Sequence, residues 1–201
     1  MEIYERRAAH LTNLEHPALL LFLADVVMLA LTVPQVLDDT FEPAATISAE
    51  ALWQSAARGD QDRFMSVMGD ILDAVHRYIP EDEDGDDLPD REELLSLAGG
   101  VVLLGQDEDS EMIQRVRSAA DLAVDIHQHL DSLINDPALL PPAHRPDITP
   151  LERAELERQI AVLSRLSRPA DQALEDLRAL TVQGSDALRG NLVLLQSRGM
   201  I

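Results

Sequence analysis

Asp25 is the residue whose surroundings most strongly suggest chemistry. It lies in the middle of the apolar stretch 18–33, where a helix would leave its carboxylate no easy route to water. A buried, unpaired carboxylate costs several kcal/mol or stays protonated. Two interpretations stay open: a structural pair with an arginine or a helix end, and an acid that borders a ligand pocket. In both cases we expect Asp25 to be mostly buried, with a polar partner within hydrogen-bonding reach.

His127 is the second residue that could do chemistry. On a helix over residues 111–134 it shares a row with Ile113, Ala120 and Ile134, beside the apolar seam. This position predicts a side chain that is at least half buried. A histidine there is either a core-edge residue with one hydrogen bond or a ligand or general base in a pocket near Asp25. Asp25 and His127 are therefore the candidate catalytic residues.

Two pairs at helical spacing offer metal ligands: Asp125 with His129, and Asp73 with His76. Carboxylates and imidazoles from different helices do build metal sites in helical bundles. Neither pair completes a three-ligand motif, and a chain with 37 acids produces such pairs by chance. We therefore expect no cofactor and no tightly bound transition metal.

The most concentrated charge is a run of six acids in seven residues, over 81–87. An EF-hand register fails, because aligning Gly85 to the sixth position puts Pro80 at the first ligand position and Arg91 at the last. We interpret the run as a solvated loop or as a binding site for a basic protein partner. Its acids are Glu81, Asp82, Glu83, Asp84, Asp86 and Asp87.

Composition limits the remaining function classes. The chain has 201 residues, with 16 arginines, no lysine, no cysteine and 37 acids, for a net charge of −21. Without cysteine, a disulfide scaffold, a cysteine-ligated metal and a cysteine nucleophile are excluded. A charge of −21 repels phosphate and argues against direct binding of nucleic acid. The net charge is −7 over residues 1–80, −14 over 81–136 and zero over 137–201, and this acidity is either functional or a bias of the source proteome.

Helices must position all of these residues, because no run alternates with period two. The segment 18–33 is too short and too interrupted to cross a membrane, so we expect a buried helix in a cytoplasmic protein. Pro17 opens this helix, which runs to about Thr32, and Pro34 stops it. After a connector over 41–47, we expect helices over 48–58, capped by Ser48, and over 60–79, capped by Asp60. A helix over 91–104 is opened by Asp90 and Glu93 and interrupted at Gly99 and Gly100, and another follows over 111–134. The C-terminal helices are 150–166, capped by Thr149, and one that starts at Ser167 and breaks at Gly184.

The expected fold is an all-α bundle of about seven helices. We divide it into an acidic helical core (1–136), a Pro-rich linker (137–149) and a C-terminal helical pair (150–201) that packs on the core. No phosphate-binding loop, dinucleotide motif, zinc-protease motif or serine-hydrolase motif is present. The sequence therefore favours a non-enzymatic binding protein, such as an inhibitor, an antitoxin or immunity-type factor, or an adaptor, which engages a basic site on a protein partner. The alternative is an enzyme of small-molecule metabolism or a ligand-binding protein with a pocket near Asp25 and His127. A homodimer is left open.

Overall fold

The computed structural model describes residues 2–41, 44–79, 88–107, 109–135, 147–167 and 170–201, without the side chains of 44–49 and 170–173. Within these ranges the chain is helical and has no strand, which confirms the predicted all-α bundle. The helices are α1 (Glu2–Thr12), α2 (His16–Ala30), α3 (Thr32–Leu37), α4 (Ala44–Arg58), α5 (Gln61–Val75), the 3-10 turn η1 (His76–Tyr78), α6 (Asp90–Gln106), α7 (Met112–Asn135), α8 (Pro150–Leu166) and α9 (Ala170–Ser197).

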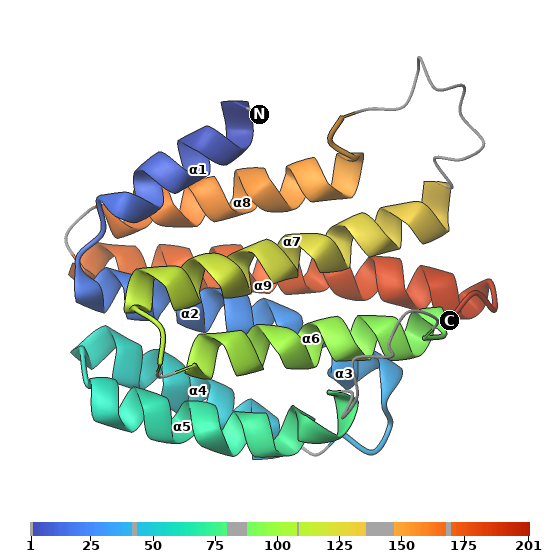
Figure 1. The fold of residues 1–201 in the computed structure, drawn as a ribbon, viewed down its shortest axis with the longest axis horizontal. Coiled ribbons are helices and arrows are strands. Elements are labelled where there is room, and N and C mark those ends of the chain that lie inside the picture. The colour runs from blue at the N-terminus through green and yellow to red at the C-terminus, as the bar shows by residue number, and fades with distance from the viewer. Residues whose placement is uncertain (1, 42–43, 80–87, 108, 136–146, 168–169) are drawn as a thin grey trace.

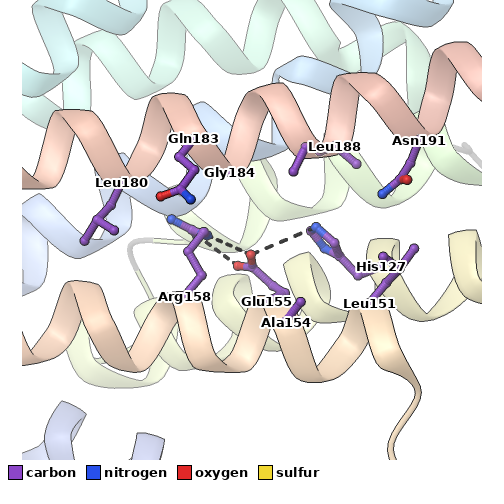
Figure 2. A pocket seen from close by; sticks show the side chains of 11 residues that line it. His127, Leu151, Ala154, Glu155, Arg158, Leu180, Gln183, Gly184, Leu188 and Asn191 are labelled. Atoms are coloured by element: carbon purple, nitrogen blue, oxygen red, sulfur yellow. Dashed lines mark hydrogen bonds and ion pairs between the residues drawn. The ribbon is translucent and has the colours of Figure 1, made fainter.

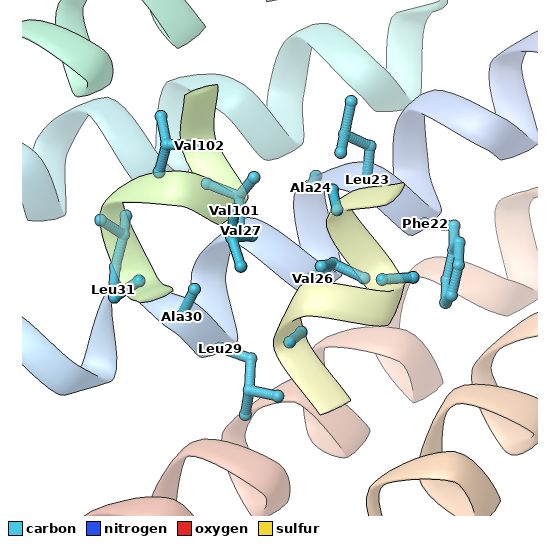
Figure 3. Packing of buried hydrophobic residues seen from close by; sticks show 14 of the residues in the cluster. Phe22, Leu23, Ala24, Val26, Val27, Leu29, Ala30, Leu31, Val101 and Val102 are labelled. Carbon is cyan, nitrogen blue, oxygen red and sulfur yellow. The ribbon is translucent and has the colours of Figure 1, made fainter. Parts of the chain in front are cut away.

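Helix α2 lies at the centre of the bundle because it is apolar on every side. Every residue from Leu19 to Val27 is buried, and the helix contacts α4, α6, α7, α8 and α9. Figure 3 shows side chains from Phe22 to Leu31 packed among neighbouring helices, with Val101 and Val102 of α6 against them. Each such side chain contributes about 1.5–3 kcal/mol when fully buried. The helical stretch His16–Leu37 is long and apolar enough to cross a membrane. Of its most apolar 18 residues, 83% are buried inside the fold.

The predicted end of this helix near Thr32 is confirmed, since α2 ends at Ala30, but Pro34 does not stop the helical structure. After Leu31, the chain turns into the short helix α3, and Pro34 lies in the first turn of that helix. Proline is tolerated there because the first-turn N–H groups have no partner within the helix. The apolar stretch therefore continues as a second buried helix, and Val33 and Leu37 belong to the core.

The remaining helices surround α2 in an order that Figure 1 shows. Helices α1 and α8 lie at one edge of the bundle, and α4 and α5 lie at the opposite edge. The predicted seam of α7 is confirmed, since Val116, Ala123 and Leu130 are buried. Helix α8 packs on α1 and α7, and α9 packs on α2, α3 and α8. The division at the Pro-rich linker stays a prediction, because 136–146 lie outside the described residues.

Several helix ends follow the sequence signals and others do not. Asp60 caps α5, since its Oδ1 accepts from the Arg63 backbone N–H at 3.0 Å. Gly59 ends α4 with φ at +66°, a conformation that favours glycine. The carboxylate of Glu152 accepts from the Thr149 backbone N–H at 3.0 Å, as the capping-box pattern predicts. The connector over 41–47 and the cap at Ser48 are wrong, because α4 already begins at Ala44.

The three glycines predicted to interrupt helices, Gly99, Gly100 and Gly184, instead lie within unbroken helices, and the last two permit close packing. Helix α6 runs unbroken through Gly100, where an added Cβ would lie 2.7 Å from Leu122 of α7. Helix α9 runs unbroken through Gly184, where an added Cβ would lie 2.7 Å from Cδ of Arg158 on α8. At either position an added methyl group would force the neighbouring side chain to move. The glycine at 184 brings α9 against the side chain that organises the polar interior.

Candidate functional site

Asp25 is fully buried and has partners on two other helices, which confirms the predicted burial and pairing. Arg158 of α8 donates from Nη1 to both of its carboxylate oxygens, at 2.8 and 2.9 Å. Thr181 of α9 places Oγ1 2.7 Å from Asp25 Oδ1 and 3.0 Å from the Leu177 carbonyl oxygen. The acid in the apolar helix is thus joined to α8 and α9 by charge-assisted hydrogen bonds.

Glu155 holds the other side of the Arg158 guanidinium. Nε and Nη2 of Arg158 donate to the two oxygens of Glu155 at 2.7 and 2.9 Å, in the fork geometry that arginine and carboxylate prefer. Burial raises the pKa of Glu155, but the charge and hydrogen bonds of Arg158 outweigh it and hold this pKa below its ordinary value. Burial lowers the pKa of Arg158, and the two carboxylates raise it above its usual range. In the ion triad formed by Asp25, Glu155 and Arg158, two carboxylates share one guanidinium.

Polar side chains extend this triad to the far edge of the bundle. Gln159 donates from Nε2 to Glu155 Oε1 at 2.9 Å and to the Ala120 carbonyl at 3.1 Å. Its Oε1 accepts from Arg7 of α1 at 2.9 Å, and Arg7 also donates to Asp121 of α7. A continuous path of hydrogen bonds thus connects α1, α2, α7, α8 and α9. Buried polar groups paired in this way contribute to a single arrangement of the helices.

His127 faces the triad from α7 and is buried, as predicted. Its Nδ1 lies 3.0 Å from the Ala123 carbonyl oxygen, which can only accept, so Nδ1 carries a proton. Nε2 points toward Glu155 and lies 4.0 Å from its Oε2. In the neutral imidazole, Nε2 is then a second acceptor beside the carboxylate, with no hydrogen bond between them. Figure 2 shows the imidazole and the guanidinium on either side of the Glu155 carboxylate.

A pocket of about 300 Å³ opens between α7, α8 and α9 at this point. Its walls are mostly apolar and come from Leu151, Ala154, Leu180, Ala187 and Leu188. Glu155, Arg158 and His127 form its polar end, with side chains that are 1%, 10% and 9% exposed. Figure 2 shows Gln183 and Asn191 of α9 across from that end. An apolar cavity with a few converging polar groups is the usual form of a small-molecule site.

The structure does not bring the site residues predicted from the sequence together in one site. His127 lines this pocket, whereas Asp25 lies behind it and reaches it only through Arg158. Asp73 and His76 are exposed and stay a pair of candidates without a third ligand among the described residues. Asp125 is exposed, and His129 turns instead toward Asp90 and Glu93 of α6. The acidic run over 81–87 lies outside the described residues.

Sequence reasoning missed Glu155 and Arg158, the two residues that organise the pocket. A signal for them exists in α8. Glu155 and Arg158 occupy the same helical row as the apolar residues Leu151 and Val162, at spacings of four, three and four. Two opposite charges on an apolar row predict a buried ion pair, since neither charge reaches water from there.

No protein-family model matches this chain, and searches of the curated proteins and of the solved structures find no match. Function therefore rests on the geometry of this chain.

Proposed function

We propose that this protein binds a small organic molecule with an apolar body and a protonated amine, in the pocket between α7, α8 and α9. The observation that carries the proposal is the ion triad of Asp25, Glu155 and Arg158, in which two carboxylates share one guanidinium at the end of a mostly apolar pocket. A cavity of about 300 Å³ suits a ligand at the small end of the usual range.

Hydrogen-bonding capacity favours an amine over other head groups. Arg158 already donates to both carboxylates. With a neutral imidazole, two acceptors at this end of the pocket have no donor: the remaining lone pair of Glu155 Oε2 and His127 Nε2. These two acceptors lie 4.0 Å apart, and one ammonium placed between them donates to both. A hydroxyl has one hydrogen and satisfies only one acceptor. A carboxylate adds a second negative charge in a site of low dielectric, which is strongly unfavourable.

The same geometry supports binding without covalent catalysis. The eleven described residues that line the pocket include no hydroxyl or thiol side chain, so none of them supplies a nucleophile of that kind. Glu155 is held by two hydrogen bonds from Arg158 in its ionised form, so it is poorly placed to exchange a proton with a ligand. The role we propose is recognition, as in a ligand sensor or carrier.

Matched probes test the head group. Hexylamine, hexan-1-ol and hexanoate share one apolar chain and differ only in the group that meets Glu155 and His127. We expect hexylamine to raise the melting temperature most at equal concentration, hexan-1-ol less, and hexanoate not at all, because only a bound ligand stabilises the fold. Equal effects of the three probes contradict the proposed head group.

Two phenylalanine variants test the location. Ala187→Phe fills the pocket from α9, and Ala179→Phe adds the same side chain at an exposed position of α9 that does not line it. We expect Ala187→Phe to abolish the response to hexylamine and Ala179→Phe to retain it. If ligand-observed NMR shows that both variants still bind hexylamine, the binding site lies elsewhere.

The uneven charge supports a second candidate function, binding of a basic protein partner by the acidic run over 81–87. The segment 81–136 carries a net charge of −14, which is two-thirds of the total. Such a field steers a basic partner to the surface and accelerates association. The test needs a basic protein that is isolated by its binding to this chain. Stopped-flow kinetics then compare how fast it associates with the native chain and with a variant in which the acids of 81–87 are replaced by neutral residues.

A further inference from the structure

Three potential metal ligands that are distant in sequence meet where α6 begins beside α7. Asp90 and Glu93 lie in the first turn of α6, and His129 lies on α7. One ligand atom from each residue can be chosen so that all three lie within 4.8 Å of one another. The imidazole Nδ1 is 3.3 Å from Glu93 Oε1, and Nε2 is 3.6 Å from Asp90 Oδ1.

The fold leaves these side chains without another task. The sequence pattern predicts that Asp90 and Glu93 form a capping box, but Pro89 occupies the N-cap position and no side chain caps the helix. Both carboxylates turn to His129 instead. The Nε2 atom of His129 is enclosed and has no hydrogen-bond partner among the described residues, although the side chain as a whole is 14% exposed. The imidazole thus has one carboxylate beside each ring nitrogen, Asp90 at the enclosed Nε2 and Glu93 at Nδ1, and such a nitrogen is an available metal ligand.

We infer that Asp90, Glu93 and His129 bind one divalent first-row metal ion, such as Mn²⁺ or Zn²⁺. Imidazole and carboxylate together suit these ions, whose bonds to nitrogen and oxygen are about 2.0–2.2 Å long. Because Asp90 faces Nε2 and Glu93 faces Nδ1, binding of one ion requires a side-chain rotation that brings both carboxylates to the same ring nitrogen. Two carboxylates and a neutral imidazole carry a charge of −2, which the ion neutralises.

The surroundings leave space for further ligands on the ion. A surface hollow of about 420 Å³ adjoins the cluster and is lined by Glu93 and His129 themselves, together with Leu97, Asp125, Gln128 and Ser132. Three protein ligands with open positions facing a hollow are typical of sites where water or a substrate completes the coordination. Asp90 and Glu93 lie in the first turn of α6, where the positive end of the helix dipole favours negative charge.

This inference opposes the sequence-based expectation that no transition metal binds tightly. That expectation paired His129 with Asp125 because both lie on one helix. The ligands that the structure brings to His129 come from α6 instead. A proton on His129, shared between the two carboxylates, is the competing state that the experiment has to exclude.

Calorimetric titration of the chelator-treated full chain with MnCl₂ and with ZnSO₄ tests the site. We expect one ion per chain, a dissociation constant in the micromolar range, and weakening of about tenfold or more in each of Asp90→Asn, Glu93→Gln and His129→Ala. Far-UV circular dichroism confirms that each variant is folded. Asp73→Asn with His76→Ala removes the exposed pair on α5 and η1 and serves as the control, which should bind as the native chain does.

Two further measurements make the result decisive. Bound Mn²⁺ gives an altered electron paramagnetic resonance signal, and Zn²⁺ shifts the imidazole resonances of His129 while leaving those of His76 unchanged. Failure of both ions to bind below about 1 mM overturns the inference. Binding that survives His129→Ala overturns it too, since adventitious binding to an acidic surface needs no imidazole.

Discussion

At the scale of single residues, the interior is organised by charges that water cannot reach. Sequence reasoning predicted that Asp25 is buried and paired, because an acid inside an apolar helix has no other stable state. It could not name Arg158, since the two residues meet only when α2 and α8 pack. Sequence reasoning also predicted the burial of His127, but not that its Nε2 would lie 4.0 Å from Glu155.

The first prediction concerns the pair formed by Asp25 and Arg158. Asp25→Ala should lower the free energy of unfolding by about 3–5 kcal/mol, because it leaves a buried guanidinium partly unpaired. Thr181→Val removes only the hydroxyl beside Asp25 and should cost about 1 kcal/mol. Urea denaturation of both variants, of Arg158→Met and of the double variant gives the coupling energy. If the losses of unfolding free energy in Asp25→Ala and Arg158→Met simply add in the double variant, the two side chains do not interact directly.

A second prediction concerns the pH dependence of Asp38 and Tyr78. Hydrogen bonds from Thr40 and Tyr78 lower the pKa of Asp38 to about 2, while burial and Asp38 raise the pKa of Tyr78 to about 12. The stabilisation from ionised Asp38 is complete above its ordinary pKa and is lost as the pH falls toward 2. The stabilisation from neutral Tyr78 is lost as the pH rises from 10 toward 12.

Denaturant unfolding between pH 4 and pH 2 measures the acid side. The native chain should lose stability more steeply than Asp38→Asn, with a difference in slope well below the ~1.4 kcal/mol per pH unit of one fully linked proton, because solvent screens this site. Asp39→Asn, at the exposed neighbouring position, is the control and should follow the native curve. Parallel curves for all three chains would show that the hydrogen bonds of Asp38 add nothing to stability.

At the scale of elements, local signals predicted helices well and predicted their continuity poorly. Periodicity and caps located α5, α7 and α8, because these signals act within a few residues. Pro34, Gly100 and Gly184 were misinterpreted as stops or breaks. In the sequence, a proline in the first turn of a helix or a glycine packed against a neighbouring helix cannot be told from a residue that ends a helix. Only the packing of the helices distinguishes the two cases.

The third prediction compares two glycines of α9. Gly184→Ala should destabilise the chain by about 1–3 kcal/mol, because the new methyl group lies 2.7 Å from Cδ of Arg158 and 3.2 Å from Leu29. Gly190 has no atom within 4 Å of an added Cβ, so Gly190→Ala should stabilise by about 0.5–1 kcal/mol through helix propensity alone. Thermal unfolding measures both. A gain in stability in both variants would show that α9 and α8 are not held together at Gly184.

At the scale of the whole molecule, a helical bundle is built around one apolar helix and carries a surplus of negative charge outside it. The buried cluster includes side chains from α2, α4, α5, α6, α7, α8 and α9, so the predicted C-terminal pair shares the main core. Composition predicted the surplus charge and the lack of cysteine chemistry without any structure. It could not predict the pocket, which depends on how three helices meet.

The last prediction tests the surplus charge through the run Glu81, Asp82, Glu83, Asp84, Asp86 and Asp87. Replacing these acids with serine and asparagine should leave the melting temperature unchanged or raise it, because like charges in a net −21 chain repel one another. Added NaCl should raise the melting temperature of the native chain more than that of the variant, since salt screens this repulsion. Association with a basic partner should become slower and less dependent on salt. A marked drop in melting temperature would show that these acids make stabilising contacts, and an unchanged association rate would place the partner's site elsewhere.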